Sequence, residues 1–485
     1  MNELNNSTQE SPRVTIVKGL SPSKNFMEGI ENLGGIEKFI KSEDKVFIKI
    51  NLMSLGGYPT NIDFDLLKCV VKECNRVGCD VIVGAFPYFN ISTRQISVML
   101  GLQSFFENIG VKFILLDKSD LLYNRKLKEK ELKNIKHEWF DIISIEDRKY
   151  LFPKSILKTN KLIIINQFNV DPVFGFNLSF LNLLHLVPYF SRKIESSPEK
   201  FKDFLNKSNK INVSDYYSQL IATKCVDIYK IKRPNLIIND LFCILEGAGP
   251  LIFTDSNLKK TNLTIIGNDI VSTDIITSRV LEQNIYENEI ILEARERRIG
   301  PSELSDIEVV NSNIEENQIK IIKCPKKLEN LDVINCDIKT GEICSGCFKQ
   351  LYFLLNFLKT YAIKDLKYLQ NFSLLSGLNP PDPRNNKDII IFGDCAIKST
   401  KDSQYRSKTI KTLIKKNEKE VKNKDILEIA GCPPTIELTF KAIYNYFGKA
   451  KMPSLNFFLK MGKLIEEKTY KTNLTKFEEA FLKNV

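Results

Sequence analysis

Four cysteines in the C-terminal part of the chain have the residue type and the positions of metal ligands. Cys344 and Cys347 form a C-x-x-C pair, and Cys395 and Cys432 follow at wider intervals. Apolar residues recur at helical spacing after Cys347, which predicts that the pair lies at a helix N-terminus. Cys395 and Cys432 each follow a short apolar run that is typical of a strand. Thiolates at such corners can bind a metal or an anionic iron–sulfur cluster.

The spacing of the four cysteines favours a cluster over a single metal ion. Structural zinc usually takes a second close C-x-x-C pair, whereas here the third and fourth ligands are isolated. We therefore expect an iron–sulfur cluster, most simply a 4Fe-4S cluster, with zinc as the alternative. Cys69, Cys74 and Cys79 are interpreted as small buried hydrophobic residues. Four protein ligands would close the cluster, so we expect electron transfer rather than substrate binding at iron.

Composition indicates a globular protein without a membrane segment. The chain has 485 residues and is 43% hydrophobic, enough for about two or three cores. The first residues are polar, with no apolar core of a signal peptide, and no apolar run approaches the roughly 18 residues of a membrane span. The odd number of 11 cysteines fits reduced thiols better than a disulfide framework. These features predict a cytoplasmic location and no membrane partner.

The net charge of +11 does not indicate a nucleic-acid partner. The excess is mostly lysine, spread along the whole chain. The basic stretch 401–424 lacks the interleaved aromatic residues of a platform on which bases stack. We expect instead an electron donor or acceptor protein and a small-molecule substrate, whose identities the sequence does not give.

The N-terminal part alternates apolar strands with amphipathic helices. Strands are predicted at 14–17, 45–52, 80–84 and 111–117, with helices between the later ones. This βαβαβ pattern predicts an α/β fold with a mostly parallel sheet covered by helices on both faces. Ligands bind such sheets at the carboxyl ends of the strands.

Polar residues follow several of the predicted strands and form the candidate site of this part. We expect two groups of residues to be candidates for a substrate or cation site. The first group is Lys49, Asn51, Asn182 and His185, and the second is the carboxylates Asp240, Glu246, Asp269 and Asp274. The carboxylates could hold a divalent cation or bind substrate hydroxyls. The alternative for Asp269 and Asp274 is that they only cap a helix start.

Four motifs in this part resemble the domain-of-unknown-function family 362, over about residues 45–311. They are Lys49-Ile50-Asn51-Leu52; Asp240 with Glu246-Gly247-Ala248-Gly249-Pro250; Ser272-Thr273-Asp274 followed by Arg279-Val280-Leu281; and Arg298-Ile299-Gly300 with Leu304-Ser305-Asp306-Ile307-Glu308-Val309. Members of that family occur alone or fused to ferredoxin-like iron–sulfur modules. The resemblance implies an α/β fold and an association with redox chemistry, but no particular reaction.

The chain departs from the family pattern at two places. The family has a Lys-x-His after the strand that here ends at Asn166, where this chain has Asn169 and Asp171. It also has a Lys-Asn pair in the next helix, where this chain has Leu181-Asn182. Two basic groups and a histidine of the family are thus missing, and His185 is the nearby substitute.

These observations predict three segments: a disordered tail at 1–13, an α/β domain at 14–311, and a second, smaller α/β cluster-binding domain at 312–485. The expected function is electron transfer or reductive chemistry on an unidentified substrate. Two alternatives remain: a metal-assisted non-redox enzyme that uses the four carboxylates, and a zinc-stapled binding protein without catalysis.

Overall fold

The computed structural model describes most of the chain, namely residues 11–52, 57–86, 100–114, 138–192, 197–207, 215–301, 303–363, 371–383, 388–406 and 426–435, with isolated positions besides. Of the disordered tail predicted at 1–13, residues 1–10 lie outside the described residues, and Arg13 already belongs to the first strand.

A large sheet organises the N-terminal part, in the strand order β14-β1-β13-β10-β7-β2-β3-β4. Strand β13 is antiparallel to its neighbours β1 and β10, and the other neighbouring strands are parallel. The predicted α/β fold with a mostly parallel sheet is therefore confirmed. The strands are β1 (Arg13–Lys18), β2 (Lys45–Lys49), β3 (Asp80–Gly84), β4 (Lys112–Phe113), β7 (Lys161–Gln167), β10 (Leu236–Asp240), β13 (Leu263–Gly267) and β14 (Glu308–Val309).

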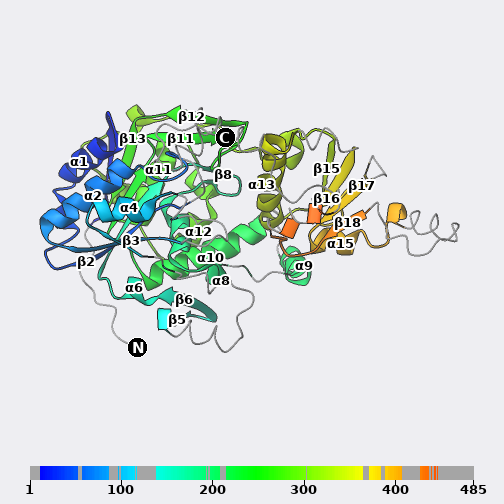
Figure 1. Ribbon diagram of the computed structural model, residues 1–485, viewed down its shortest axis with the longest axis horizontal. Coiled ribbons are helices and arrows are strands. Elements are labelled where there is room, and N and C mark those ends of the chain that lie inside the picture. Colours follow the sequence, from blue (N-terminus) through cyan, green and yellow to red (C-terminus); the bar gives the residue numbers. More distant parts are fainter. Residues whose placement is uncertain are drawn as a thin grey trace.

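Helices cover both faces of this sheet (Figure 1). Alternate strand residues point to opposite faces, so Val46 and Ile48 of β2 join one core while Phe47 joins the other. The first core is completed by α1 (Pro22–Asn32), α2 (Phe64–Val77) and α4 (Leu102–Asn108). The second is completed by α7 (Ser179–Asn182), α10 (Asp215–Ile231), α11 (Ile270–Val280) and α12 (Glu289–Glu296).

Helix α2 shows how local sequence sets these boundaries. The side chain of Asp63 accepts a hydrogen bond from the backbone N–H of Leu66 and so caps the first turn. The helix ends at Gly78, whose φ of 90° lies in the left-handed region that glycine tolerates best.

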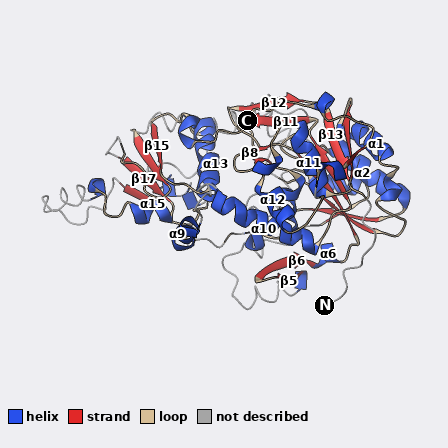
Figure 2. Ribbon diagram, turned by 180° about the vertical axis from the view of Figure 1, so that it is seen from behind, coloured by secondary structure: helices blue, strands red, loops and turns tan. Residues whose placement is uncertain are grey.

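The second sheet has four strands, all parallel, in the order β15-β16-β17-β18. They are β15 (Cys336–Thr340), β16 (Phe372–Ser376), β17 (Asp388–Phe392) and β18 (Ile426–Ile429). Helix α13 (Ser345–Tyr361) lies between the two sheets and packs against α10, while α15 (Asp394–Ser399) follows β17 (Figures 1 and 2). One apolar core includes residues of both α10 and α13. The predicted domain division at 311/312 stays a prediction.

Short elements connect these layers. The remaining strands form three hairpins: β5 (Phe140–Ile145) with β6 (Arg148–Pro153), β8 (Val170–Asp171) with β9 (Gly175–Phe176), and β11 (Cys243–Gly247) with β12 (Ser256–Lys260). The remaining α-helices are α6 (Lys154–Leu157), α8 (Tyr189–Arg192) and α9 (Pro198–Lys207). The 3₁₀ helices are η1 (Ile36–Lys38), η2 (Leu183–Leu186), η3 (Ile285–Glu287), η4 (Leu304–Asp306), η5 (Glu315–Asn317) and η6 (Leu328–Leu331).

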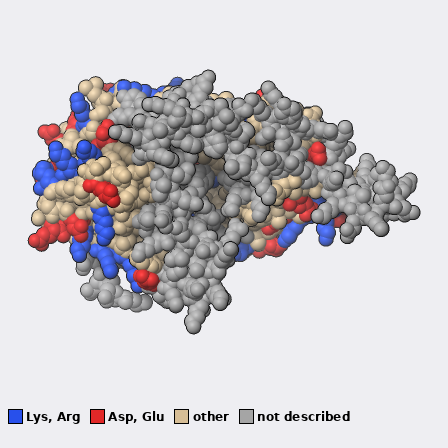
Figure 3. All heavy atoms as spheres, viewed as in Figure 1, with Lys and Arg blue, Asp and Glu red and all other residues tan. Residues whose placement is uncertain are grey.

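The surface of the described residues is mixed in charge. On the face seen in Figure 3, Lys and Arg side chains alternate with Asp and Glu instead of forming one continuous basic area. Among the described helices, none combines the length and the apolar character that crossing a bilayer requires.

Candidate functional site

The four predicted ligand cysteines meet at one edge of the second sheet. Cys344 is the N-cap of α13 and Cys347 lies in its first turn. Cys395 lies in the first turn of α15, directly after β17, and Cys432 follows β18 across Gly431. Because β15 to β18 are parallel, their carboxyl ends point to the same edge. The ends of β15, β17 and β18 thus bring the four cysteines to the same edge of the sheet.

Glycines hold the backbone close to these thiols. A Cβ atom at Gly393 would lie 3.1 Å from Sγ of Cys347, and Gly393 has a φ of 92° that favours glycine. The loops after β17 and β18 are tied together, because Asp394 donates its N–H to the carbonyl of Gly431 and accepts the N–H of Gly431 at 2.8 Å. The loop backbone can therefore approach a group bound between the thiols.

Electrostatic coupling also indicates that the four sulfur atoms are neighbours. The thiol of Cys347 and the backbone N–H groups of Cys347 and Gly346 donate to Cys344, which lowers the pKa of Cys344 to about 7. The same hydrogen bond and burial raise the pKa of Cys347, and negative charge at Cys432 and Cys395 adds to this. Burial, with Cys432 and Cys344 nearby, raises the pKa of Cys395 to about 12.

The donor set fits a group bound by thiolates. Four thiols with glycine beside them offer soft ligands and little side-chain obstruction. In the described part of the chain, no set of three or more His, Cys, Asp or Glu is already arranged around one metal ion. The thiols are thus gathered at one edge, without converging on a single point.

A buried polar network forms the second candidate site, in the large sheet. Lys49, at the end of β2, is fully buried and donates from Nζ to Oδ1 of Asn182. Nδ2 of Asn182 donates to Oδ1 of Asn51 at 2.5 Å and to Oδ1 of Asn166 at 3.0 Å. Nδ1 of His185 lies 3.2 Å from the same Oδ1 of Asn182. The structure therefore brings Lys49, Asn51, Asn182 and His185 together around one side-chain amide.

The network continues to Asp274 through amide side chains. Nδ2 of Asn166 donates to Oδ1 of Asn239 at 2.7 Å, and Nδ2 of Asn239 donates to Oδ1 of Asp274 at 3.1 Å. Asp274 also accepts the backbone N–H groups of Ser179 and Phe180, at the start of α7. Burial raises the pKa of Asp274 to about 7, although these donors favour its charged form. Asp274 thus links α11 to the helix that carries Asn182.

Positive charge surrounds the Lys49 end of this network. Burial lowers the pKa of Lys49, and the nearby guanidinium of Arg192 lowers it further. Burial also lowers the pKa of His185, with added effects of Arg192, Lys49 and Lys349. The imidazole of His185 is therefore neutral near pH 7, and its tautomer decides whether Nδ1 donates to Asn182 or accepts.

Helix α13 reaches this network from the thiol edge. Asp171 occupies the position at which the resemblance leads us to expect the histidine of Lys-x-His. Its Oδ1 accepts the backbone N–H groups of Val173 and Phe174, and its Oδ2 lies 3.5 Å from Nζ of Lys349 on α13. The helix that begins at Cys344 thus brings a cation, Lys349, to this position.

Among the described residues, the four carboxylates are not grouped as ligands of one metal ion, and the substrate or cation site that they were expected to form stays a prediction. Asp240 accepts hydrogen bonds from the hydroxyl of Tyr58 at 3.1 Å and from the N–H of Phe242. Glu246 accepts the N–H of Ile322 at 3.0 Å and lies 3.8 Å from Nζ of Lys259. Both carboxylates thus have partners within their own surroundings.

Strand direction explains why this set is dispersed. Because β13 is antiparallel to β10, Asp269, two residues after β13, lies at the opposite edge of the sheet from Asp240. Asp269 caps α11 by accepting the N–H of Ser272 at 2.8 Å, as the alternative interpretation predicts. Asp274 lies within α11 and caps α7 rather than starting its own helix.

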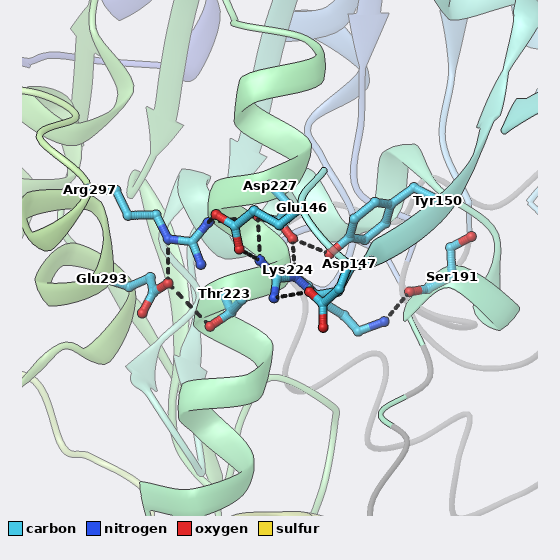
Figure 4. A network of polar contacts seen from close by, with 10 residues as sticks. Glu146, Asp147, Tyr150, Ser191, Thr223, Lys224, Asp227, Glu293 and Arg297 are labelled. Atoms are coloured by element: carbon cyan, nitrogen blue, oxygen red, sulfur yellow. Dashed lines mark hydrogen bonds and ion pairs between the residues drawn. The ribbon is translucent and has the colours of Figure 1, made fainter. Parts of the chain in front are cut away.

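Another buried carboxylate is absent from the sequence-based candidates. Asp227 on α10 is fully buried and binds Nε of Arg148 at 2.6 Å, Nη1 of Arg297 at 2.8 Å and the hydroxyl of Tyr150 at 2.5 Å (Figure 4). These contacts fasten the β5-β6 hairpin and the end of α12 to α10. The sequence signal that could have indicated this buried carboxylate is an Asp within the apolar run of residues 225–229.

Sequence reasoning also missed Tyr58, Asn239 and Lys349. Lys349 lies only two residues after Cys347 in a run that reads as an ordinary helix, so no sequence signal distinguishes it from a solvent-exposed lysine.

Comparisons with known proteins bear on the first part of the chain. The family model "Domain of unknown function (DUF362)" matches residues 46–279. No curated protein matches the chain. Among solved structures, the lactate racemase apoprotein from Thermoanaerobacterium thermosaccharolyticum aligns with 94% of this chain and 90% of its own, at 10% identity and a TM-score of 0.33. The match includes two of the four motifs described above in full and a third up to Arg279, and the predicted resemblance to this family is therefore confirmed over residues 46–279.

Proposed function

We propose that Cys344, Cys347, Cys395 and Cys432 bind an iron–sulfur cluster, and that the protein acts in electron transfer or reductive chemistry. The observation that carries this proposal is the gathering of the four cysteines at the carboxyl edge of a wholly parallel sheet. Bound there, a cluster would supply one-electron chemistry. The chain's own residues would supply four sulfur ligands, and the N–H groups of Gly346 and Cys347 would donate to sulfur, which tunes a potential.

The position of helix α13 supports a link between the four thiols and the part of the chain that matches the DUF362 model. The helix begins at the thiols and pairs through Lys349 with Asp171. A Cβ atom at Gly346 would lie 2.8 Å from the ring of Tyr217 on α10, so the first turn of α13 approaches α10 closely. An electron from a partner protein would thus arrive close to the polar network around Asn182, where a small-molecule substrate is expected to bind.

Metal analysis of protein purified without oxygen tests the proposal. We expect about four irons and four sulfides per chain and a broad absorbance near roughly 400 nm that bleaches with dithionite. Stoichiometric zinc without iron or visible absorbance would contradict the redox function and favour a structural zinc site. Chain without either metal after anaerobic preparation would contradict both.

Substitution of Gly393 tests the cradle around the thiols. In Gly393→Ala the new Cβ would press on Sγ of Cys347, so we expect clearly less iron per chain. Gly110→Ala is the matched control, because Gly110 also has a positive φ, 67°, but no atom within 4 Å of a Cβ. The backbone penalty is about 1–2 kcal/mol at Gly110 but up to roughly 3 kcal/mol at Gly393, whose ψ is 149°, so a denaturant titration of both variants accompanies the iron assay. Equal iron content in the two variants would show that the loop does not enclose a bound group.

A further inference from the structure

Two side chains contact the amide of Asn182, and two further cations act on them. Nζ of Lys49 and Nδ1 of His185 both contact Oδ1 of this amide, so they are close neighbours. Arg192, on α8 directly after the 3₁₀ helix that carries His185, acts electrostatically on both residues. Lys349 of α13 also acts electrostatically on His185.

Lys49 has no counter-charge in this place. It is fully buried, and its partner is the neutral amide oxygen of Asn182. In the described part of the chain, no carboxylate lies within ion-pair distance of Lys49, and its charged neighbour is another cation, Arg192. Asp274, the carboxylate of the network, is separated from Lys49 by the amides of Asn166 and Asn239. A buried ammonium without a carboxylate is unfavourable unless it loses its proton or meets an anion.

The surroundings of Lys49 are those of an oxyanion site. Ammonium and guanidinium groups donate charge-assisted hydrogen bonds to carboxylate and phosphate oxygens. The amides of Asn51 and Asn182 lie in the same network and can orient a bound group. The carboxylate that pairs with Lys349, Asp171, also accepts two backbone N–H groups.

We propose that Lys49, Arg192, Lys349 and His185 bind a carboxylate or phosphate group of a small-molecule substrate. This inference deepens the proposed function, on which it rests for the reductive chemistry, by naming the substrate class. The anionic group would neutralise Lys49 and hold the rest of the substrate beside the helix that begins at the thiols.

Calorimetric titration of the full chain with acetate and with inorganic phosphate, at constant ionic strength set by chloride, tests the site. We expect saturable binding of one of them, and the anion that binds identifies the group. Lys49→Met should weaken that binding at least about 10-fold, because a charged hydrogen bond is lost. Lys45→Met is the matched control, since Lys45 lies on the same strand with an exposed side chain. It should bind like the unmodified chain.

Three results would overturn the inference: no saturable binding of either anion, equal affinity of Lys49→Met and the unmodified chain, or equal losses in both lysine variants. If Lys49→Met does not fold, the same titration is made with Arg192→Gln, and an unchanged anion affinity in that variant would overturn the inference. Cys432→Ser separates this inference from the proposed function. Anion binding that persists in Cys432→Ser without iron supports the site whatever the fate of the cluster. Anion binding that is absent from unmodified protein with a full cluster overturns the site alone.

Discussion

The two sheets of this protein treat their polar residues in opposite ways. In the second sheet all four strands are parallel, and the residues after three of them bring four thiols to one edge. In the large sheet, β13 is antiparallel to β10. Asp240 and Asp269 therefore lie at opposite edges of the sheet, although each is close to the carboxyl end of its strand. Similar sequence patterns, a strand followed by a polar residue, therefore give one gathered set and one dispersed set. The direction of the strands decides which outcome occurs.

The two sets also differ in how their members are satisfied. Asp269 and Asp274 accept backbone N–H groups at helix starts, and Asp240 accepts the hydroxyl of Tyr58. In these contacts the carboxylates stabilise the fold. Cys347 and Cys395 instead have other thiols as neighbours, and these thiols together with burial raise the pKa of both groups, so that they can lose their protons to a bound cation or cluster.

The largest effect that would test this contrast is expected at Cys432. In Cys432→Ser one of the gathered ligands is lost, and we expect most of the iron and the absorbance near roughly 400 nm to disappear. The measurement is iron and sulfide per chain after anaerobic purification. Cys336→Ser is the control, because Cys336 belongs to the same sheet but lies at the opposite end of β15. Equal iron in both variants would mean that Cys432 is not a ligand.

A large loss of stability is expected at Asp227, a fully buried carboxylate that pairs with two arginines. Asp227→Asn keeps the shape but leaves Arg148 and Arg297 facing a neutral amide, which should lower the free energy of unfolding by roughly 3 kcal/mol. Denaturant titration measures this. Glu199→Gln, which breaks an exposed pair with Lys398, should change nothing measurable. A small effect at Asp227 would mean that the network in Figure 4 is dispensable for the fold.

Local patterns predicted the strands well because apolar runs and caps are short-range signals. The prediction of 80–84 as a strand matches β3, and the C-x-x-C pair lies at the start of α13 as predicted. The strand predicted at 45–52 is shorter, because β2 ends at Lys49. The prediction of 111–117 as a strand holds only for Lys112–Phe113 among the described residues.

The partners of the candidate residues could not be predicted in the same way. That β13 is antiparallel depends on long-range pairing with β1 and β10, and no local residue reveals it. The contact between Asp171 and Lys349 joins residues 178 positions apart, so it also depends on how α13 packs. The sequence thus predicts which residues are polar at strand ends, but their grouping follows from the fold.

A smaller effect is the pH dependence caused by Asp274. Its pKa is about 7 in the folded chain and near 4 when unfolded, so between these values the folded state holds the extra proton. The contribution of Asp274 to the free energy of unfolding should therefore be fully present below about pH 4 and should be lost as the pH rises toward 7. Asp274→Asn cannot ionise, so the decrease should become shallower in denaturant titrations from pH 4 to 8. Burial also raises the pKa of Glu289 to about 7, so adding Glu289→Gln should make the decrease shallower again, while the lowered pKa values of His185 and Lys49 contribute a slope of opposite sign that neither variant removes. An unchanged slope in Asp274→Asn would mean that this carboxyl stays charged.

The smallest effect is expected at Asp269, and it tests the dispersed set directly. If this carboxylate only caps α11, Asp269→Ala should lower the free energy of unfolding by about 1 kcal/mol, and Asp269→Asn should restore most of the loss because an amide oxygen can accept the N–H of Ser272. Calorimetric titrations with Mg²⁺, Mn²⁺ and Ca²⁺ should be the same for both variants and the unmodified chain. If the unmodified chain bound a cation that Asp269→Ala no longer bound, the carboxylate would act as a ligand. The contrast between gathered thiols and dispersed carboxylates would then fail at this residue.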